Sequence, residues 1–228
     1  MATDTRARLR QLLESKEASL QPATLPQREL WETTSLPLDS PSNHICAFLE
    51  VRGALTPDHA TAALQRVVNR QDVLRLSLLP GKNQRLQLIR SSGTAIVNFR
   101  DAGKDAVADV MAPTFDQPFD LVRGPLYRVE IVRRNPDEIF LVLAIHHAIA
   151  DGWSLGVFVE DLVNSYILGL ASGHRELPPV PLTCTAWDAN ERTRWRQPTS
   201  FAENIAFWET HLEAAPKVWN RPRPPIET

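Results

Sequence analysis

Two adjacent histidines, His146 and His147, precede Asp151 and Gly152 within one short segment. A neutral imidazole near pH 7 can accept a proton in a transition state. A carboxylate four residues later can hold its tautomer or pair with a basic residue. Gly152 permits a positive φ or a close approach of the backbone to another group. These residue types in one turn predict a functional site, and a purely structural role is the alternative.

The flanking segments predict how this turn is held. Residues 139–145 are continuously apolar, which predicts a central strand covered on both faces. Residues 155–170 carry apolar side chains at helical spacing, which predicts a helix with its stripe in the core. Adjacent side chains at a strand end point to opposite faces, so one histidine should face a cleft and the other should pack inward. The positive helix N-terminus would favour a developing oxyanion.

A metal site is a further alternative for the same residues. His147 and Asp151 are two possible ligands, but the sequence offers no matched third one, because the other histidines lie in unrelated contexts. The two cysteines, Cys46 and Cys184, are isolated and form no metal-ligand spacing. We therefore predict no bound metal.

Strands and helices alternate irregularly along the chain, with a hairpin signal at Asn135-Pro136-Asp137. Thr56, Pro57 and Asp58 form a helix start, with a cap, a first-turn proline and a first-turn acid. The pattern predicts an α+β fold, a mixed α/β sandwich. We expect helices at 4–19, 26–33, from 56, near 103–112, 155–170, 184–196 and 200–213, and strands at 44–52, 73–79, 84–90, 95–99, 126–134 and 138–145.

Composition excludes several classes of function. The formal charge is −2 from 25 basic and 27 acidic residues, so no basic excess favours nucleic-acid binding. The longest apolar run, 139–145, is far too short to span a membrane. The first 20 residues lack an apolar signal core, and two isolated cysteines are typical of a reducing cytoplasm. Prolines crowd the last third, and residues 221–225 predict a linker.

The segment from His146 to Ser154 resembles the HHxxxDG motif of condensation domains from nonribosomal peptide synthetases. The motif is shared with the wider group of chloramphenicol acetyltransferase-like acyltransferases. Gln71 stands where the second condensation motif usually has histidine, and Trp187 alone represents the fourth motif. Further segments resemble condensation domains in the family's order: 25–31, 69–75, 119–121 with 124–126 and Arg128, 207–212 and 221–224.

The resemblance implies a division of the chain. Condensation domains consist of two chloramphenicol acetyltransferase-like lobes in a V, with the motif in the cleft. The family pattern implies an N-terminal helical extension at 1–22, the N-terminal lobe at 23–180, and a bridge towards a missing C-terminal lobe at 181–228. An isolated chain of this kind should be inactive without the second lobe.

The resemblance also implies an amide-forming acyltransferase. His147 would take the proton of the acceptor amine or position that amine, while His146 would pack and support the loop. Asp151 would form an ion pair for which Arg75 is the candidate, and Gly152 would offer its N–H to the oxyanion. Trp153 would support the site, with its side chain in the core.

The implied reaction joins a carrier-bound donor acyl or peptidyl thioester to a carrier-bound acceptor amine, in antibiotic or secondary-metabolite biosynthesis. No cofactor would be bound directly, since the substrates arrive on phosphopantetheine arms. The implied partners are donor and acceptor peptidyl carrier proteins, adjacent synthetase domains and the C-terminal lobe, in the cytoplasm, with no nucleic acid or membrane. The alternatives are a non-catalytic module that recruits carriers or domains, and a coenzyme A-dependent HHxxxDG O-acyltransferase.

Overall fold

A computed structural model describes residues 2–33, 37, 39–53, 55–81, 85–103, 105–136, 138–172, 177–197, 199 and 201–215. The linker predicted at 221–225 lies outside these residues. The chain divides into two compact units, Met1–Thr185 and Ala186–Thr228, which are described separately. The first unit contains both sheets and the HHxxxDG segment.

The larger sheet is built around the predicted central strand. Its order is β2 (His44–Val51), β7 (Glu138–His146), β6 (Tyr127–Asn135) and β5 (Val97–Asp101). The β6–β7 hairpin and the β2–β7 pair are antiparallel, and β5 runs parallel to β6. Residues 139–146 of β7 are all buried, which confirms the strand that the continuous apolar run predicted.

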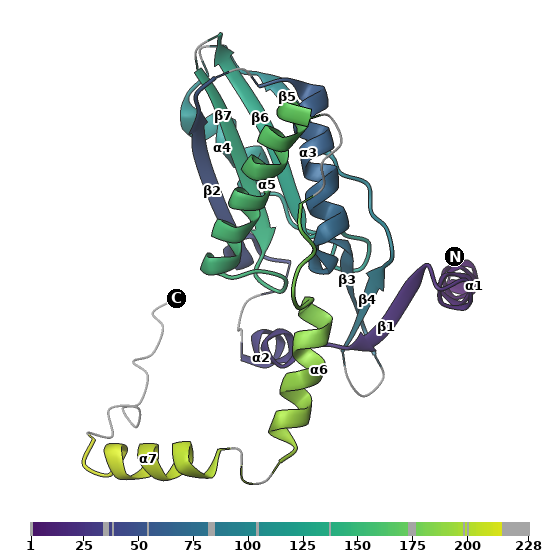
Figure 1. Ribbon diagram of the computed structural model, residues 1–228, viewed down its shortest axis with the longest axis vertical. Coiled ribbons are helices and arrows are strands. Elements are labelled where there is room, and N and C mark those ends of the chain that lie inside the picture. Colours follow the sequence, from purple (N-terminus) through teal and green to yellow (C-terminus); the bar gives the residue numbers. More distant parts are fainter. Residues whose placement is uncertain are drawn as a thin grey trace, which may run out of the picture. The chain divides into compact units, whose positions relative to one another are not determined.

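Helices cover both faces of this sheet (Figure 1). Helices α3 (Pro57–Arg70) and α5 (Gly152–Ser172) pack on one face, and α4 (Val107–Phe115) packs on the other. The predicted start of α3 is confirmed, because the Thr56 side chain accepts a hydrogen bond from the N–H of His59. The apolar face of α3 is fully buried against the sheet: Ala60, Ala63, Leu64, Val67 and Val68.

Helix α5 is half core and half surface. Phe158 and Leu162 are buried, whereas Val163, Ile167 and Leu170 are 47%, 55% and 56% exposed. The prediction that the whole stripe packs in the core is therefore wrong for its outer part. By length and composition α5 is apolar enough to cross a membrane, a test that core helices also pass.

A smaller sheet corrects the predicted N-terminal helix. Helix α1 spans Ala2–Glu14 and ends early, since Lys16 has a φ of 59° and redirects the chain. Residues Ala18–Pro22 then form β1, which pairs with β4 (Leu86–Arg90) beside β3 (Leu76–Leu79). Residues 18–22 are thus sheet and not helix. The start of the strand expected at 73–79 is instead a 3-10 turn, η2 (Asp72–Arg75).

Three of the remaining helices were predicted from their patterns: α2 (Leu25–Thr33), α6 (Cys184–Trp195) and α7 (Ala202–Leu212). The 3-10 turn η1 (Pro41–Asn43) was not predicted. In the second unit, Trp195 stacks on Phe201 with ring centroids 4.1 Å apart. No residue of α7 is buried, and its large apolar side chains are exposed: Ile205, Phe207, Trp208 and Leu212. Mixed helices and sheets confirm the α+β class.

Candidate functional site

The end of β7 separates the two histidines of the motif. His146 is the last residue of the strand and is fully buried, with 0% exposure. His147 follows the strand and is exposed. One imidazole therefore packs inward and the other is accessible, as the strand alternation predicted. An accessible imidazole is the one that can meet a substrate.

Hydrogen bonds from three separate segments hold the histidine pair. The N–H of His146 donates to the carbonyl of Leu126 (2.9 Å), and the N–H of His147 donates to the carbonyl of Asn43 (2.8 Å). The Gln27 side chain, from α2, donates to the carbonyl of Ala148 (3.1 Å). The backbone around His147 is thus fixed on both sides.

The buried His146 also bonds within the turn. Its Nδ1 accepts a hydrogen bond from the N–H of Ala148 (3.0 Å). A neutral imidazole has one donor and one acceptor nitrogen, so the proton of His146 is on Nε2. This geometry agrees with a supporting position beneath the turn.

Asp151 caps helix α5 and does not form the predicted ion pair. Its Oδ1 accepts from the N–H (2.8 Å) and the hydroxyl (2.6 Å) of Ser154. The Ser154 hydroxyl, followed by its N–H, holds the pKa of Asp151 below its usual value. The carboxylate therefore sits at the helix N-terminus, where it offsets part of the positive end of the helix dipole. That charge reduces the attraction which we expected the bare helix end to have for an oxyanion.

Arg75, the expected partner of Asp151, is engaged elsewhere. Its guanidinium donates to the carbonyls of Asn69 (2.8 Å), Gln71 (3.3 Å), Arg90 (2.9 Å) and Val68. Burial lowers the pKa of Arg75, and the nearby Asp72 opposes this effect. The predicted Arg75–Asp151 pair is wrong because the guanidinium satisfies the orphan carbonyls at the end of α3.

A different ion pair links the second motif to α5. Asp161 Oδ1 lies 2.7 Å from Arg70 Nη1, and its Oδ2 accepts from the Gln71 side-chain amide at 2.8 Å. Asp161 is buried and both side chains of the ion pair are largely shielded from solvent. Gln71, where the family usually has histidine, thus supplies a donor that fastens α3 to α5.

Gly152 and Trp153 begin α5 on its exposed side. Gly152 has no positive φ, and a Cβ built on it would meet nothing within 4 Å. We expected Gly152 to have a positive φ or to allow a close approach of the backbone to another group, and the first of these expectations is wrong. Trp153 is 84% exposed, so the prediction that it packs in the core is also wrong. It lies in the first turn, ahead of the residues that reach the sheet.

Four residues near the motif were not predicted as site residues. Gln27 and Asn43 hold the histidine loop, as described above. Arg128 lies 3.8 Å from the ring centre of Phe119 and donates to the carbonyls of Gln117 and Pro118, each at 2.6 Å. His44 Nδ1 lies 2.7 Å from the carbonyl oxygen of Phe115. Gln27 and Arg128 fall in segments that carry the resemblance, but no sequence signal marks Asn43 or His44.

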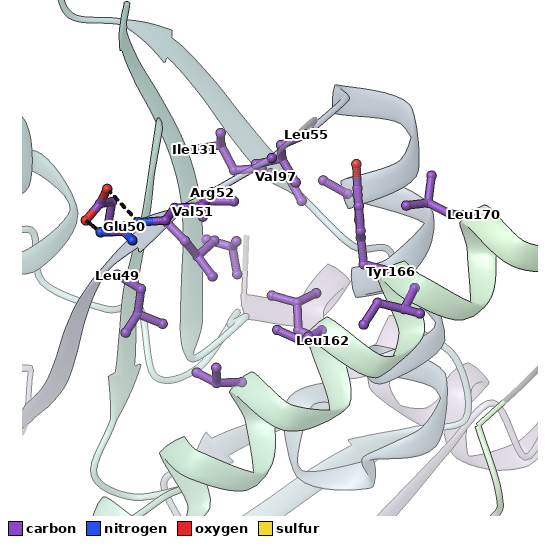
Figure 2. A pocket seen from close by; sticks show the side chains of 17 residues that line it. Leu49, Glu50, Val51, Arg52, Leu55, Val97, Ile131, Leu162, Tyr166 and Leu170 are labelled. Carbon is purple, nitrogen blue, oxygen red and sulfur yellow. Dashed lines mark hydrogen bonds and ion pairs between the residues drawn. The ribbon is translucent and has the colours of Figure 1, made fainter. Parts of the chain in front are cut away.

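An apolar cavity lies away from the motif, beside the second half of α5 (Figure 2). Its volume is about 550 Å³, and its walls come mainly from α5, β2 and β6. Figure 2 shows the side chains of Leu162 and Tyr166 along α5 and the Glu50–Arg52 ion pair, 3.2 Å long, on β2 and just after it. The described residues that line it include no histidine or cysteine, and their one carboxylate, Glu50, is paired with Arg52.

Metal ligation has no support among the described residues. They contain no group of three or more histidine, cysteine, aspartate or glutamate side chains placed to hold one ion. His147 and Asp151 therefore have no third ligand in that part of the chain.

Comparison with known proteins decides the family. The family model described as "Condensation domain" matches residues 17–225. The chain belongs to the condensation-domain family. Phosphinothricin tripeptide synthetase PhsC from Streptomyces viridochromogenes is 28% identical over 218 residues, covering 91% of this chain and 20% of that protein. Nonribosomal peptide synthetase kk1B from Curvularia clavata is 28% identical over 213 residues, covering 89% of this chain and 2% of that protein.

Solved structures agree on the fold of this condensation-domain chain. The starter condensation domain of rhizomide synthetase RzmA has a TM-score of 0.71 at 20% identity, and SgcC5 from Streptomyces globisporus has 0.72 at 24%. The match covers 87% and 85% of this chain but only 49% and 46% of theirs. The chain thus spans about half of these solved structures and a small part of the curated synthetases.

Proposed function

We propose that this chain is the N-terminal lobe of a condensation domain in a nonribosomal peptide synthetase. Its role is amide formation between a carrier-bound donor thioester and a carrier-bound acceptor amine. The observation that carries the proposal is the HHxxxDG turn, where His146 is buried and His147 is exposed on a hydrogen-bonded backbone. The curated relatives are peptide synthetases, which supports this reaction class.

The reaction forms one C–N bond and breaks one C–S bond. The acceptor amine attacks the donor carbonyl carbon, the tetrahedral intermediate collapses, and the phosphopantetheine thiolate leaves. The proton lost by the amine goes to His147 or, through solvent, to the departing sulfur. In the first case His147 is a general base, and in the second it positions the amine.

Positioning supplies part of the acceleration. Two reactants held on tethered arms react as if in one molecule, which raises their effective concentration. The loop that presents His147 is fixed by Leu126, Asn43 and Gln27, so the imidazole starts from a defined position. The N–H of Gly152, in the first turn of α5, has no carbonyl partner inside the helix and is the proposed oxyanion donor.

The partners follow from the same proposal. A second lobe would complete the cleft, and the exposed apolar residues of α7, such as Phe207 and Trp208, are suitable for covering by it. Donor and acceptor peptidyl carrier proteins would deliver the thioesters, and neighbouring synthetase domains would follow in the same cytoplasmic assembly. The chain itself would bind no cofactor, and alone it would not complete the reaction.

The test uses the chain joined to a second lobe, with donor and acceptor loaded on carriers. His147→Ala should lower the rate of amide formation about 10²–10⁴-fold. His59→Ala, an exposed histidine on α3, is the matched control and should keep the parent rate. An unchanged rate in His147→Ala would contradict the catalytic role of His147, whereas carrier binding without amide formation by the parent would support the recruiting module. Turnover with coenzyme A thioesters but not with carrier thioesters would support the O-acyltransferase.

A further inference from the structure

His44 is an imidazole beside the motif that the proposed chemistry does not use. It is the first residue of β2 and lies opposite His146 in the antiparallel register with β7. Its ring centre is 6.1 Å from that of His146 and 4.7 Å from that of Phe119, with both pairs edge-to-face. His44 therefore helps to enclose the buried histidine of the motif.

The hydrogen bond of His44 fixes its tautomer. Its Nδ1 is 2.7 Å from the carbonyl oxygen of Phe115, and a carbonyl only accepts, so Nδ1 carries the proton. The Nε2 atom is buried and has no hydrogen-bond partner among the residues that the structure describes. Burial lowers the pKa of His44; the Phe115 carbonyl opposes this effect, Arg128 adds to it and Asp116 opposes it. The ring is consequently a neutral donor at pH 7.

The acceptor of that bond is itself anchored. Phe115 ends α4, and the following loop is held by Arg128 through the carbonyls of Gln117 and Pro118. On the other side of the bond, His44 directly follows Asn43, whose carbonyl accepts the N–H of His147. A short chain of contacts thus runs from the α4 loop through His44 to the backbone of His147.

We propose that His44 is a positioning residue for His147. The Nδ1–H bond to Phe115 fixes the start of β2, and with it the Asn43 carbonyl that holds the His147 backbone. The β2–β7 ladder fixes the register of β2, and the Nδ1–H bond adds a directional constraint at its first residue that the ring contacts with Phe119 and His146 do not supply. The catalytic relevance of His44 rests on the proposed function of His147, but its effect on the His147 backbone can be tested without measuring turnover.

The experiment compares two variants of the 228-residue chain with a control. His44→Asn keeps a side-chain N–H near the position of Nδ1, whereas His44→Phe keeps a ring and loses the donor. His59→Phe alters an exposed histidine on α3. Amide hydrogen exchange at His147 should become about tenfold faster in His44→Phe and stay near the parent rate in the other two. Nitrogen-15 NMR of the parent should show His44 as the Nδ1–H tautomer.

Several outcomes would overturn the role of His44. An Nε2–H tautomer would do so, as would unchanged exchange at His147 in His44→Phe or equal loss of protection in His44→Asn. Exchange at Leu143, in the middle of β7, reports whether His44→Phe has merely loosened the whole sheet, which would also contradict the proposal. These measurements need no catalysis, so they stand even if amide formation fails.

With a second lobe joined, activity gives an independent readout. His44→Phe should lower kcat about tenfold and leave KM for the carrier substrates near the parent value, because carrier contacts are unchanged. His44→Asn should restore most of kcat. A rise in KM without a fall in kcat would mean that His44 affects substrate binding and not the position of His147.

Discussion

The two ends of helix α5 differ in character: its first turn follows the HHxxxDG histidines, and its second half forms the wall of an apolar cavity. At its start, the HHxxxDG turn exposes His147 above the buried His146, and its backbone forms hydrogen bonds with Leu126, Asn43 and Gln27. Along its second half, apolar side chains line a cavity, and Tyr166 and the Glu50–Arg52 pair are the polar groups in view (Figure 2). This cavity is therefore separate from the turn that carries the candidate catalytic histidine. In this half of a condensation domain, the hydrogen bonds that fix the HHxxxDG turn, and not the shape of a cavity, identify the candidate site.

The ion pair in the middle of α5 separates these two ends and gives the largest expected effect on stability. Asp161→Ala would leave the guanidinium of Arg70 buried without its carboxylate, at a cost of about 3–5 kcal/mol. Urea unfolding measures this loss of unfolding free energy. Asp101→Ala removes the carboxylate of the exposed pair with Arg133 and should have a much smaller effect, because solvent screens that pair. Equal effects of the two changes would mean that the Arg70–Asp161 pair does not fasten α5.

A second prediction distinguishes the buried and open sides of the cavity wall. Leu162 is buried in the core, so Leu162→Ala should destabilise the chain by about 2–5 kcal/mol. The neighbouring Val163 faces the open cavity and is half exposed, so Val163→Ala should change stability by about 0.5 kcal/mol or less. Thermal unfolding of both variants gives the comparison. A large loss in Val163→Ala would show that the cavity side of α5 is packed in solution.

The elements around the site were predictable because local periodicity determines them. The apolar run of 139–145 gave the central strand, and the Thr56 cap gave the start of α3. Alternation at the end of β7 also predicted that His146 and His147 would have different surroundings. Each of these features depends on residues that are close in the sequence.

The partners of the site residues were not predictable, since they depend on tertiary neighbours. The prediction of an Arg75–Asp151 pair failed because Arg75 meets carbonyls near the end of α3 and on β4, and Asp151 meets Ser154 three residues away. Asn43 reaches His147 only through its position just before β2, which pairs with β7. Backbone acceptors of this kind leave no residue-type signal, and the sequence therefore could not identify them.

The smallest expected effect concerns the polar end of α5. Asp151→Ala removes the cap from the N–H and hydroxyl of Ser154 and should cost about 1 kcal/mol at pH 7. The folded-state pKa of Asp151 is lowered, so its contribution is complete above the unfolded value and is lost as pH falls through the folded value. The difference between parent and variant should thus begin to shrink near about pH 4 and vanish at still lower pH.

Asp151→Asn sharpens this last prediction, because asparagine caps helices nearly as well as aspartate. Urea unfolding should place Asp151→Asn close to the parent at neutral pH and above the parent at strongly acidic pH, where the Asp151 carboxylate is protonated and the asparagine is unchanged. Asp151→Ala should differ from the parent only at the higher pH values. If both variants were equally destabilised at neutral pH, the carboxylate charge itself would be required, and an ion pair would replace the cap as its role. A result that requires only the cap would show that the motif aspartate organises the first turn of α5, to which Gly152 belongs.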